Sequence, residues 1–400
     1  KKLYDTLRDH TPVQIFPRDI DYTEWETLRK YPLLNWNMGM VYNLRESDER
    51  IYPQGELGRR TIGLTGDRGN YGIEAVYREE LAGRDGRATR QRIARGFYGR
   101  VVDGDNIDPI DGLDVVTTLD LDVQDVANRY LREQLEAQNA IWGTTIVMEV
   151  RTGEILALVN LGRTPGGGYA ERENYAIGRN TEPGSTFKSV VAAAALQEKV
   201  VSPNQVFVDP GYVMVSGRRI QNWSGTSFGT VTFTDVVKQS LNTGFAQVGL
   251  RLGAQKLTDY AKLFGFGTPT GIELPGEEGG LLFNPDDMRD SDVATMAIGQ
   301  SIAVTPLQLV TAMSAIANDG VLLKPHIVKS ITNADGSVYE EKGTTEVRRT
   351  IESATDKTLV GLLNTLHYAL IAGENERIAN DRATENAKLA KSEAIAKEAA

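Results

Sequence analysis

A serine and a lysine in the middle of the chain have the spacing that lets an amine activate a hydroxyl. In Ser185-Thr186-Phe187-Lys188 the two side chains stand at positions i and i+3, which share one face if a helix begins there. A lysine removed from water loses its proton more easily, and the neutral amine can then take the proton of the serine hydroxyl. The helix N-terminus would add positive potential where an oxyanion forms. Taken alone, the motif fits a helix cap beside a surface lysine equally well.

A second polar motif, Ser240-Leu241-Asn242, follows farther along the chain. Its hydroxyl could pass a proton between the lysine and a leaving amine, and its carboxamide could hold the lysine and bind a substrate backbone. The tripeptide by itself could equally be a polar turn between two helices. Ser202-Pro203-Asn204 also fits Ser-x-Asn, but it lies close behind the first motif and its proline is typical of a loop. We therefore take residues 240–242 as the second motif.

Composition excludes several other chemistries. The 400-residue chain has no cysteine, which rules out disulfides, a thiolate nucleophile and cysteine-ligated zinc. Its 3 histidines, His10, His326 and His367, argue against a Ser-His-Asp triad and against a histidine-rich metal site. The net charge of −10 argues against a nucleic-acid partner, because phosphate binding needs clustered Lys and Arg. No apolar run reaches the roughly 18 residues that a membrane helix needs.

Periodicity in the sequence predicts a mixed α+β fold around the two motifs. Val- and Ile-rich runs joined by Arg151-Thr152-Gly153 predict a buried hairpin. Apolar residues at helical spacing predict several helices, one of them interrupted near Thr243-Gly244. The predicted strands cover residues 113–118, 144–149, 154–160 and 321–331, and the predicted helices cover residues 71–81, 120–138, 184–196, 234–252 and 305–318.

The chain divides into a part without a catalytic motif and a part with two. Residues 1–112 are Arg-rich and punctuated by Gly and Pro, and the absence of any site motif favours a structural or docking domain. The polar stretch 105–112 marks the predicted boundary, so residues 113–400 form the second domain. The end of that domain, 371–400, is atypical. From residue 374 it contains no Gly or Pro and is dominated by Ala, Glu, Lys and Arg, which predicts a helical tail.

The two motifs and several flanking segments resemble a known family. Residues 182–188 read EPGSTFK and residues 240–244 read SLNTG, and both resemble the first two active-site motifs of penicillin-binding proteins. Residues 71–86, 115–125 and 297–308 resemble further segments of that family, so the likeness covers about residues 40–370. The combination is typical of class B, which has a transpeptidase domain on a pedestal and no glycosyltransferase. Residues 52–63 and 92–109 look more like the division-type enzymes than the elongation type.

The resemblance implies a fold, an activity and a site. The fold is α+β, an antiparallel sheet flanked by helices as in serine β-lactamases, with an N-terminal pedestal domain. The activity is peptidoglycan D,D-transpeptidation without a metal or organic cofactor. By this resemblance Ser185 attacks the stem peptide and Lys188 is the general base. Ser240 would relay the proton, and Asn242 would position the lysine and the substrate.

The resemblance also implies partners and a location. Peptidoglycan stem peptides are the substrates, and β-lactams acylate such enzymes as mimics of the substrate. A membrane glycosyltransferase is the expected partner of the pedestal. The location implied is extracytoplasmic, or periplasmic, with anchoring to the cytoplasmic membrane by an N-terminal helix that is not among these 400 residues.

One motif of the family is missing from the sequence. The third motif, Lys-Thr/Ser-Gly on a sheet strand, binds the substrate carboxylate, and neither form occurs here. The nearest match is Lys391-Ser392, followed by Glu393, whose bulk and negative charge would oppose a carboxylate, among residues that favour helix over strand. We therefore assign Lys391 and Ser392 to the tail and expect slow acylation or none. Two alternatives stay open: a non-catalytic or truncated penicillin-binding scaffold, and a serine β-lactamase.

Overall fold

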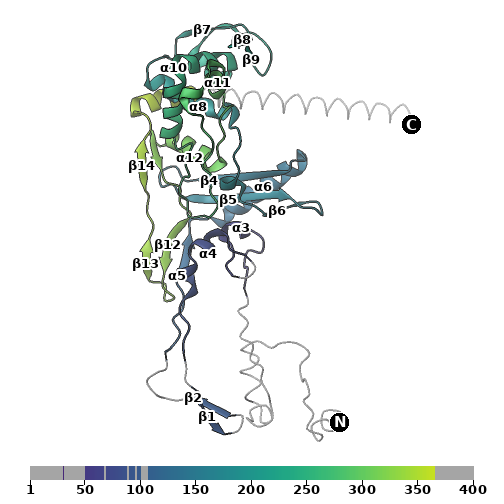
Figure 1. The fold of residues 1–400 in the computed structure, drawn as a ribbon, viewed down its shortest axis with the longest axis vertical. Helices are drawn as coiled ribbons and strands as arrows, with labels where there is room; N and C mark the ends of the chain where they lie inside the picture. The colour runs from purple at the N-terminus through teal and green to yellow at the C-terminus, as the bar shows by residue number, and fades with distance from the viewer. Residues whose placement is uncertain are drawn as a thin grey trace, which may run out of the picture. The chain divides into compact units, whose positions relative to one another are not determined.

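The computed structural model describes residues 30, 50–66, 69–87, 90–94, 97–100 and 107–364 (Figure 1). Contacts divide the chain into two compact units, Lys1–Pro53 and Gln54–Ala400, and every helix and strand named below belongs to the second. Residues 54–112 are therefore grouped with the remainder of the chain by contact. The absence of a catalytic role for residues 1–112 stays a prediction. The tail expected at 371–400 lies outside the described residues.

Short elements come first in the second unit. The helix predicted over 71–81 is two helices, because Tyr77 leaves the helical conformation with φ −98° and ψ 28°. This turn buries Tyr77 with Ile73 in an apolar cluster that also holds Ile155 and Leu158 of the sheet. The opening elements are α3 (Arg59–Ile62), α4 (Gly72–Val76), α5 (Arg78–Ala82) and the antiparallel hairpin of β1 (Arg90–Ala94) and β2 (Phe97–Arg100).

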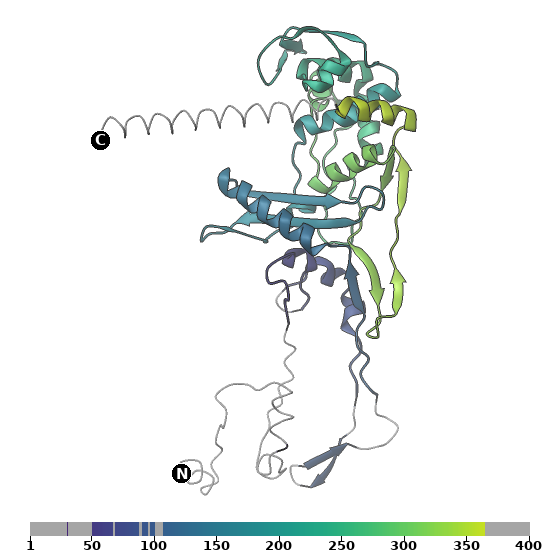
Figure 2. The ribbon, with the colours of Figure 1, turned by 180° about the vertical axis from the view of Figure 1, so that it is seen from behind.

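An antiparallel sheet carries a long amphipathic helix, α6 (Leu121–Ala137), on one face, and Figure 2 shows the helix lying along it. Asp120 begins the helix by accepting hydrogen bonds from the backbone N–H groups of Asp122 and Val123, both at 3.0 Å. The predicted hairpin is confirmed, with Ile146 opposite Leu158 in its middle. The sheet consists of β4 (Trp142–Met148), β5 (Ile155–Arg163) and the short β6 (Tyr169–Ala170).

The two long strands differ in what occupies their outer edges. Gln124 of α6 occupies the outer edge of β5: its amide donates to the Leu158 carbonyl at 3.1 Å and accepts from the Leu158 N–H at 2.8 Å. These bonds replace the strand partner that the short β6 cannot supply. Among the described residues, β4 is paired on one side only, with β5.

The helical part of the unit is built around α8 (Lys188–Gln197), a helix buried on all sides from Val190 to Ala195. A helix that is apolar all round fits only in a protein core, and α8 lies against α10. The interruption expected at 243–244 falls instead at 239–241, between α9 and α10. The helices of this part are α7 (Tyr175–Gly178), η1 (Gly184–Phe187), α8, α9 (Phe233–Lys238), α10 (Asn242–Leu263), η2 (Pro285–Asp287), α11 (Asp290–Met296) and α12 (Pro306–Ala317).

Two small antiparallel ribbons lie between the two sequence motifs, and more strands follow α12. Each ribbon has two strands. The strand predicted over 321–331 is two strands. The ribbons are β7 (Val206–Asp209) with β10 (Gly229–Thr232), and β8 (Tyr212–Val215) with β9 (Arg218–Gln221). The later strands are β11 (Val321–Leu323) with β14 (Glu346–Arg349), and β12 (Val328–Thr332) between β13 (Val338–Glu341) and β3 (Asp114–Thr117).

Candidate active site

The first motif lies at the start of α8, as the spacing predicts. A short 3₁₀ turn, η1, contains Ser185 and runs directly into α8, whose first residue is Lys188. The chain enters this turn through Gly184, which has a positive φ of 57° and donates its N–H to the Gly299 carbonyl at 2.9 Å. A Cβ on Gly299 would stand 1.8 Å from the Gly184 carbonyl oxygen. Only glycine fits at 299, so this contact fixes the turn that carries the serine.

The second motif occupies the junction between α9 and α10. Ser240 has a positive φ of 49°, unusual for a residue with a Cβ, and this turns its carbonyl out of the helical pattern. The two helices approach closely because Gly244 has no side chain: a Cβ there would stand 2.5 Å from Val236. The junction thus presents Ser240 and the first residue of α10, Asn242, toward the start of α8.

The Lys188 amine joins the two motifs. It donates to the Asn242 side-chain oxygen at 2.6 Å, to the Ser240 carbonyl at 2.8 Å and to the Ser240 hydroxyl at 3.1 Å. Only 3% of the lysine is exposed, and it forms no ion pair with any described residue. Burial lowers the pKa of the Lys188 amine from 10.5 to about 7. A large share of the molecules therefore holds a neutral amine at neutral pH.

Asn242 is itself held in one orientation. Its side-chain N–H donates to the Gln221 carbonyl at 2.8 Å, at the end of β9. The amide oxygen is therefore the atom that faces Lys188. The aromatic ring of Phe245, one turn along α10, lies 5.4 Å from the Lys188 nitrogen and closes another side of the amine's surroundings.

Ser185 stands apart from this network. Its side chain is exposed and forms no hydrogen bond with the described residues. The shared face of the two motif residues predicts a hydrogen bond between Ser185 Oγ and Lys188 Nζ, but none forms there: Ser240 and Asn242 occupy all three donor positions of a protonated amine. A free hydroxyl on the surface beside a buried amine leaves the serine open to a ligand.

The sequence reasoning named Ser185, Lys188, Ser240 and Asn242, and the structure brings the last three into direct contact. It did not find the role of Gly299, although this residue lies in a segment that resembles the family. Nor did it find the Gln221 carbonyl, which has no sequence signal. The two tail residues assigned to a degenerate third motif, Lys391 and Ser392, lie outside the described residues. Within the described ranges, no group of three or more His, Cys, Asp and Glu side chains is placed to hold a metal ion.

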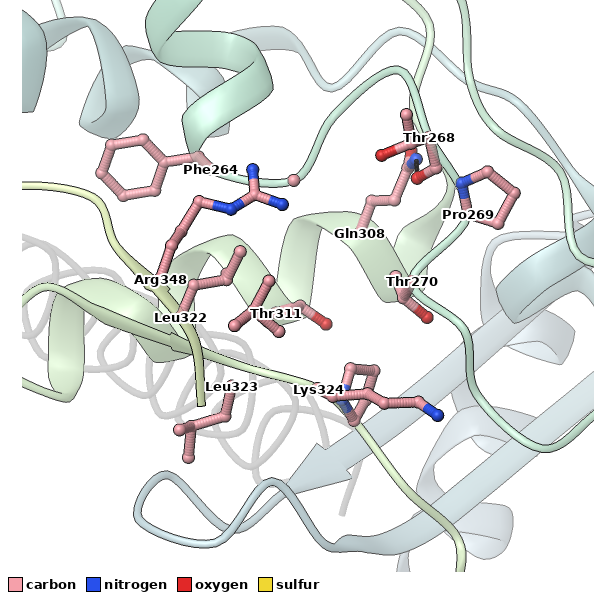
Figure 3. Close-up of a pocket in the computed structure, with 13 residues that line it drawn as sticks. Phe264, Thr268, Pro269, Thr270, Gln308, Thr311, Leu322, Leu323, Lys324 and Arg348 are labelled. Atoms are coloured by element: carbon pink, nitrogen blue, oxygen red, sulfur yellow. Dashed lines mark hydrogen bonds between the residues drawn. The ribbon is translucent and has the colours of Figure 1, made fainter. Parts of the chain in front are cut away.

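A cavity of about 90 Å³ lies elsewhere in the same unit (Figure 3). It is bounded by the end of α10, by α12 and by β11 and β14, and no residue of either motif lines it. The side chains of Arg348 and Lys324 contribute two cationic groups to its wall. Gln308 in the wall already bonds the carbonyls of Thr268 and Gly279 at 2.7 and 2.8 Å. Both motifs therefore lie outside this cavity.

The fold and the serine–lysine arrangement together define a class of protein. Residues 143–367 match the penicillin binding protein transpeptidase domain. The chain belongs to this family.

Named relatives and solved structures agree with the assignment. Stage V sporulation protein D of Bacillus subtilis is 36% identical over 293 residues, which cover 71% of this chain and 45% of that protein. Peptidoglycan D,D-transpeptidase FtsI of Escherichia coli is 32% identical over 314 residues, covering 75% and 51%. Penicillin-binding protein 3 of Mycobacterium tuberculosis has a TM-score of 0.67 at 29% identity, over 80% of this chain and 69% of that one, and was also solved with aztreonam. The chain spans about half the length of the curated relatives it matches.

Proposed function

We propose that this chain carries the acyl-transfer site of a division-type peptidoglycan D,D-transpeptidase. The Ser185 hydroxyl oxygen attacks the carbonyl of the penultimate D-Ala of a stem peptide, and an ester bond forms. The peptide bond to the terminal D-Ala breaks, and that residue leaves as an amine after receiving a proton. The amine of a neighbouring stem peptide then attacks the ester, which forms the cross-link and restores Ser185.

Lys188 is the general base of this proposal, and Ser240 passes the proton on. A neutral amine has two N–H groups and one lone pair, whereas three oxygens surround Lys188 Nζ. Two of these, the Ser240 carbonyl and the Asn242 amide oxygen, can only accept. The lone pair is therefore left for a hydroxyl. Ser240 Oγ, at 3.1 Å, is placed to move the proton between the amine and the leaving group.

The observation that carries the proposal is the burial of the Lys188 amine without a carboxylate. A surface lysine keeps its proton far above neutral pH and could not act as a base. Here burial is the cause of the lowered pKa, and the two oxygens that hold the amine come from the second motif. A helix cap beside a surface lysine would show neither feature.

Covalent labelling tests the proposal directly. The chain is incubated with a fluorescent penicillin, and the adduct is mapped by mass spectrometry. We expect the adduct on Ser185, none in the Ser185→Ala variant, and a loss of at least about a hundredfold in rate in Lys188→Met. Ser202→Ala is the matched control, because Ser202 begins the other Ser-x-Asn segment and should label normally. An adduct on another residue of a folded protein would refute the assignment.

The missing Lys-Thr/Ser-Gly sequence favours a second candidate, a non-catalytic penicillin-binding scaffold. Losing one oxyanion donor alone costs roughly 3–4 kcal/mol of transition-state stabilisation, so the whole third motif matters. Release of D-Ala from a stem-peptide analogue separates the two: the enzyme turns over, whereas the scaffold forms at most one adduct per molecule. Rapid hydrolysis of a chromogenic cephalosporin would instead identify a serine β-lactamase.

The remaining expectations are part of the same proposal. Residues 1–112 are the pedestal, contribute no catalytic side chain and dock a membrane glycosyltransferase. The site works outside the cytoplasmic membrane, where its substrate is. None of the helices in the described part has the length and apolar composition of a membrane span. Labelling of intact cells by a membrane-impermeant fluorescent penicillin tests the location. Charge substitutions in residues 54–66 test the pedestal: slower acylation in a folded variant would contradict the claim that this segment contributes no catalytic side chain.

A further inference from the structure

A buried carboxylate lies between the two motifs in the sequence and takes no part in the chemistry proposed above. Asp209, the last residue of β7, is 1% exposed, and no Lys or Arg within the described ranges pairs with it. Burial alone would raise the pKa of this carboxyl, but hydrogen bonds from Thr243, from two backbone N–H groups and from Asn222 together lower it below 3.8. The carboxylate is therefore ionised at neutral pH and held entirely by neutral donors.

The donors come from four separate segments of the chain. The first is the N–H of Gly211, at 2.9 Å, just before β8. The second is the side-chain amide of Asn222, which reaches both carboxylate oxygens at 3.0 and 2.9 Å just after β9. The N–H of Phe228 lies at 2.9 Å before β10, and the hydroxyl of Thr243 lies at 2.7 Å in the first turn of α10. One side chain therefore ties both ribbons to the helix that begins with Asn242.

Two of these donors adjoin the contacts that orient Asn242. Asn222 directly follows Gln221, whose carbonyl accepts from the Asn242 amide at 2.8 Å. Thr243 directly follows Asn242, and its own N–H donates to the Asn222 side chain at 3.3 Å. The carboxylate thus fixes the chain on both sides of the bond between Asn242 and Gln221. That bond in turn decides which atom of the amide faces Lys188.

We propose that Asp209 is the positioning residue of the lysine–asparagine pair, holding Asn242 so that its oxygen stays on the Lys188 amine and water stays out. The inference rests on the proposed role of Lys188 as the base. A carboxylate is required because only acceptors can face this set of donors. An asparagine at 209 would direct its NH₂ group at Asn222 Nδ2 or at the N–H of Phe228. If the carboxylate only stabilised the ribbons, its removal would leave the pKa of the Lys188 amine unchanged.

The experiment measures the pKa of the Lys188 amine itself, so it works whether or not the chain turns over substrate. The full chain is labelled with carbon-13 lysine, and the Cε signals are titrated from about pH 5 to pH 10. The signal that disappears in Lys188→Met identifies the residue. In Asp209→Asn we expect the pKa of Lys188 to rise by about one unit toward its ordinary value, because Asn242 is no longer held on the amine and water reaches it. Thr243→Val, which removes one donor and keeps the shape, should raise the pKa in the same direction by less.

Controls separate positioning from general stability. Asp120→Ala removes an unrelated helix cap on α6, so it should lower the melting temperature and leave the pKa of Lys188 unchanged. The double variant with Asp209→Asn and Thr243→Val should shift the pKa of Lys188 no further than Asp209→Asn alone, because both substitutions disrupt the same link between the carboxylate and α10. A folded Asp209→Asn protein, or a folded Thr243→Val protein if the former does not fold, with the wild-type pKa would overturn the positioning role. A wild-type pKa near 10.5 would instead overturn the proposed function on which this inference rests.

Discussion

The lowered pKa of Lys188 predicts how β-lactam acylation should depend on pH. If the neutral amine is the base, the second-order rate constant follows the neutral fraction of this one group. The pKa of about 7 is set by burial, with no described carboxylate to favour the proton. The rate should therefore rise with pH through neutrality and then level off, because only the deprotonated form can accept the serine proton.

The size of the change follows from the pKa. With a pKa of about 7, the neutral fraction grows from about one-eleventh at pH 6 to about ten-elevenths at pH 8, a rise of about tenfold. A lysine left at 10.5 would give about a hundredfold rise over the same interval and no plateau below about pH 10. The two cases differ in both slope and plateau, so absolute rates are not needed to separate them. This matters because acylation of a chain without a Lys-Thr/Ser-Gly motif is expected to be slow.

The assay follows the appearance of labelled protein with a fluorescent penicillin across the pH range at constant ionic strength. Circular dichroism at each pH confirms that the protein stays folded. The Ser185→Ala variant supplies the background, and the Ser240→Ala variant should keep the midpoint of the pH profile while lowering the plateau about tenfold or more. A profile that is flat around neutrality, or that still rises above about pH 9, would refute the assignment of Lys188 as a base of lowered pKa.

Three further predictions concern the surroundings of the site. Gly299→Ala should slow acylation strongly, because its Cβ would stand 1.8 Å from the Gly184 carbonyl and displace the turn that carries Ser185; a labelling rate equal to wild type in a folded variant would contradict this. Lys188→Met should raise the free energy of unfolding near pH 7 by up to about 5 kcal/mol. Because burial lowers the pKa of this amine, the folded protein loses stability as the pH falls from 10.5 to 7, and the variant removes that loss. Urea unfolding of both proteins at pH 7 and at pH 10.5 measures the difference. Asp356 is 4% exposed with one oxygen unpaired among the described residues, and burial raises its pKa to about 6. Asp356→Asn should therefore stabilise the fold by about 1–3 kcal/mol above pH 6 and by nothing below pH 3.8, whereas an equal gain at both pH values would argue for another cause.

Local patterns in the sequence were sufficient for some of the elements and for the polar side chains that meet at Lys188. The helix over 120–138 and the hairpin around Gly153 follow from periodicity and turn chemistry, and both are confirmed. Ser185 and Lys188 lie three residues apart, so their spacing alone places both at the start of α8. The predicted positions of the helix breaks were less accurate. Tyr77 splits one predicted helix, and the interruption before α10 comes ahead of Thr243-Gly244. The first break depends on the burial of Tyr77 against the distant sheet and the second on the positive φ of Ser240, and propensity contains neither.

The amino-acid sequence alone identified the two motifs, the family they resemble and the polar side chains near α8. It could not give the state of the Lys188 amine, because its lowered pKa depends on burial and on oxygens of Ser240 and Asn242, 52 and 54 residues away. Nor could it show that Asp209 reaches Thr243 across 34 residues. Proton affinity and side-chain orientation depend on desolvation and on convergent donors, and only the folded chain brings those groups together.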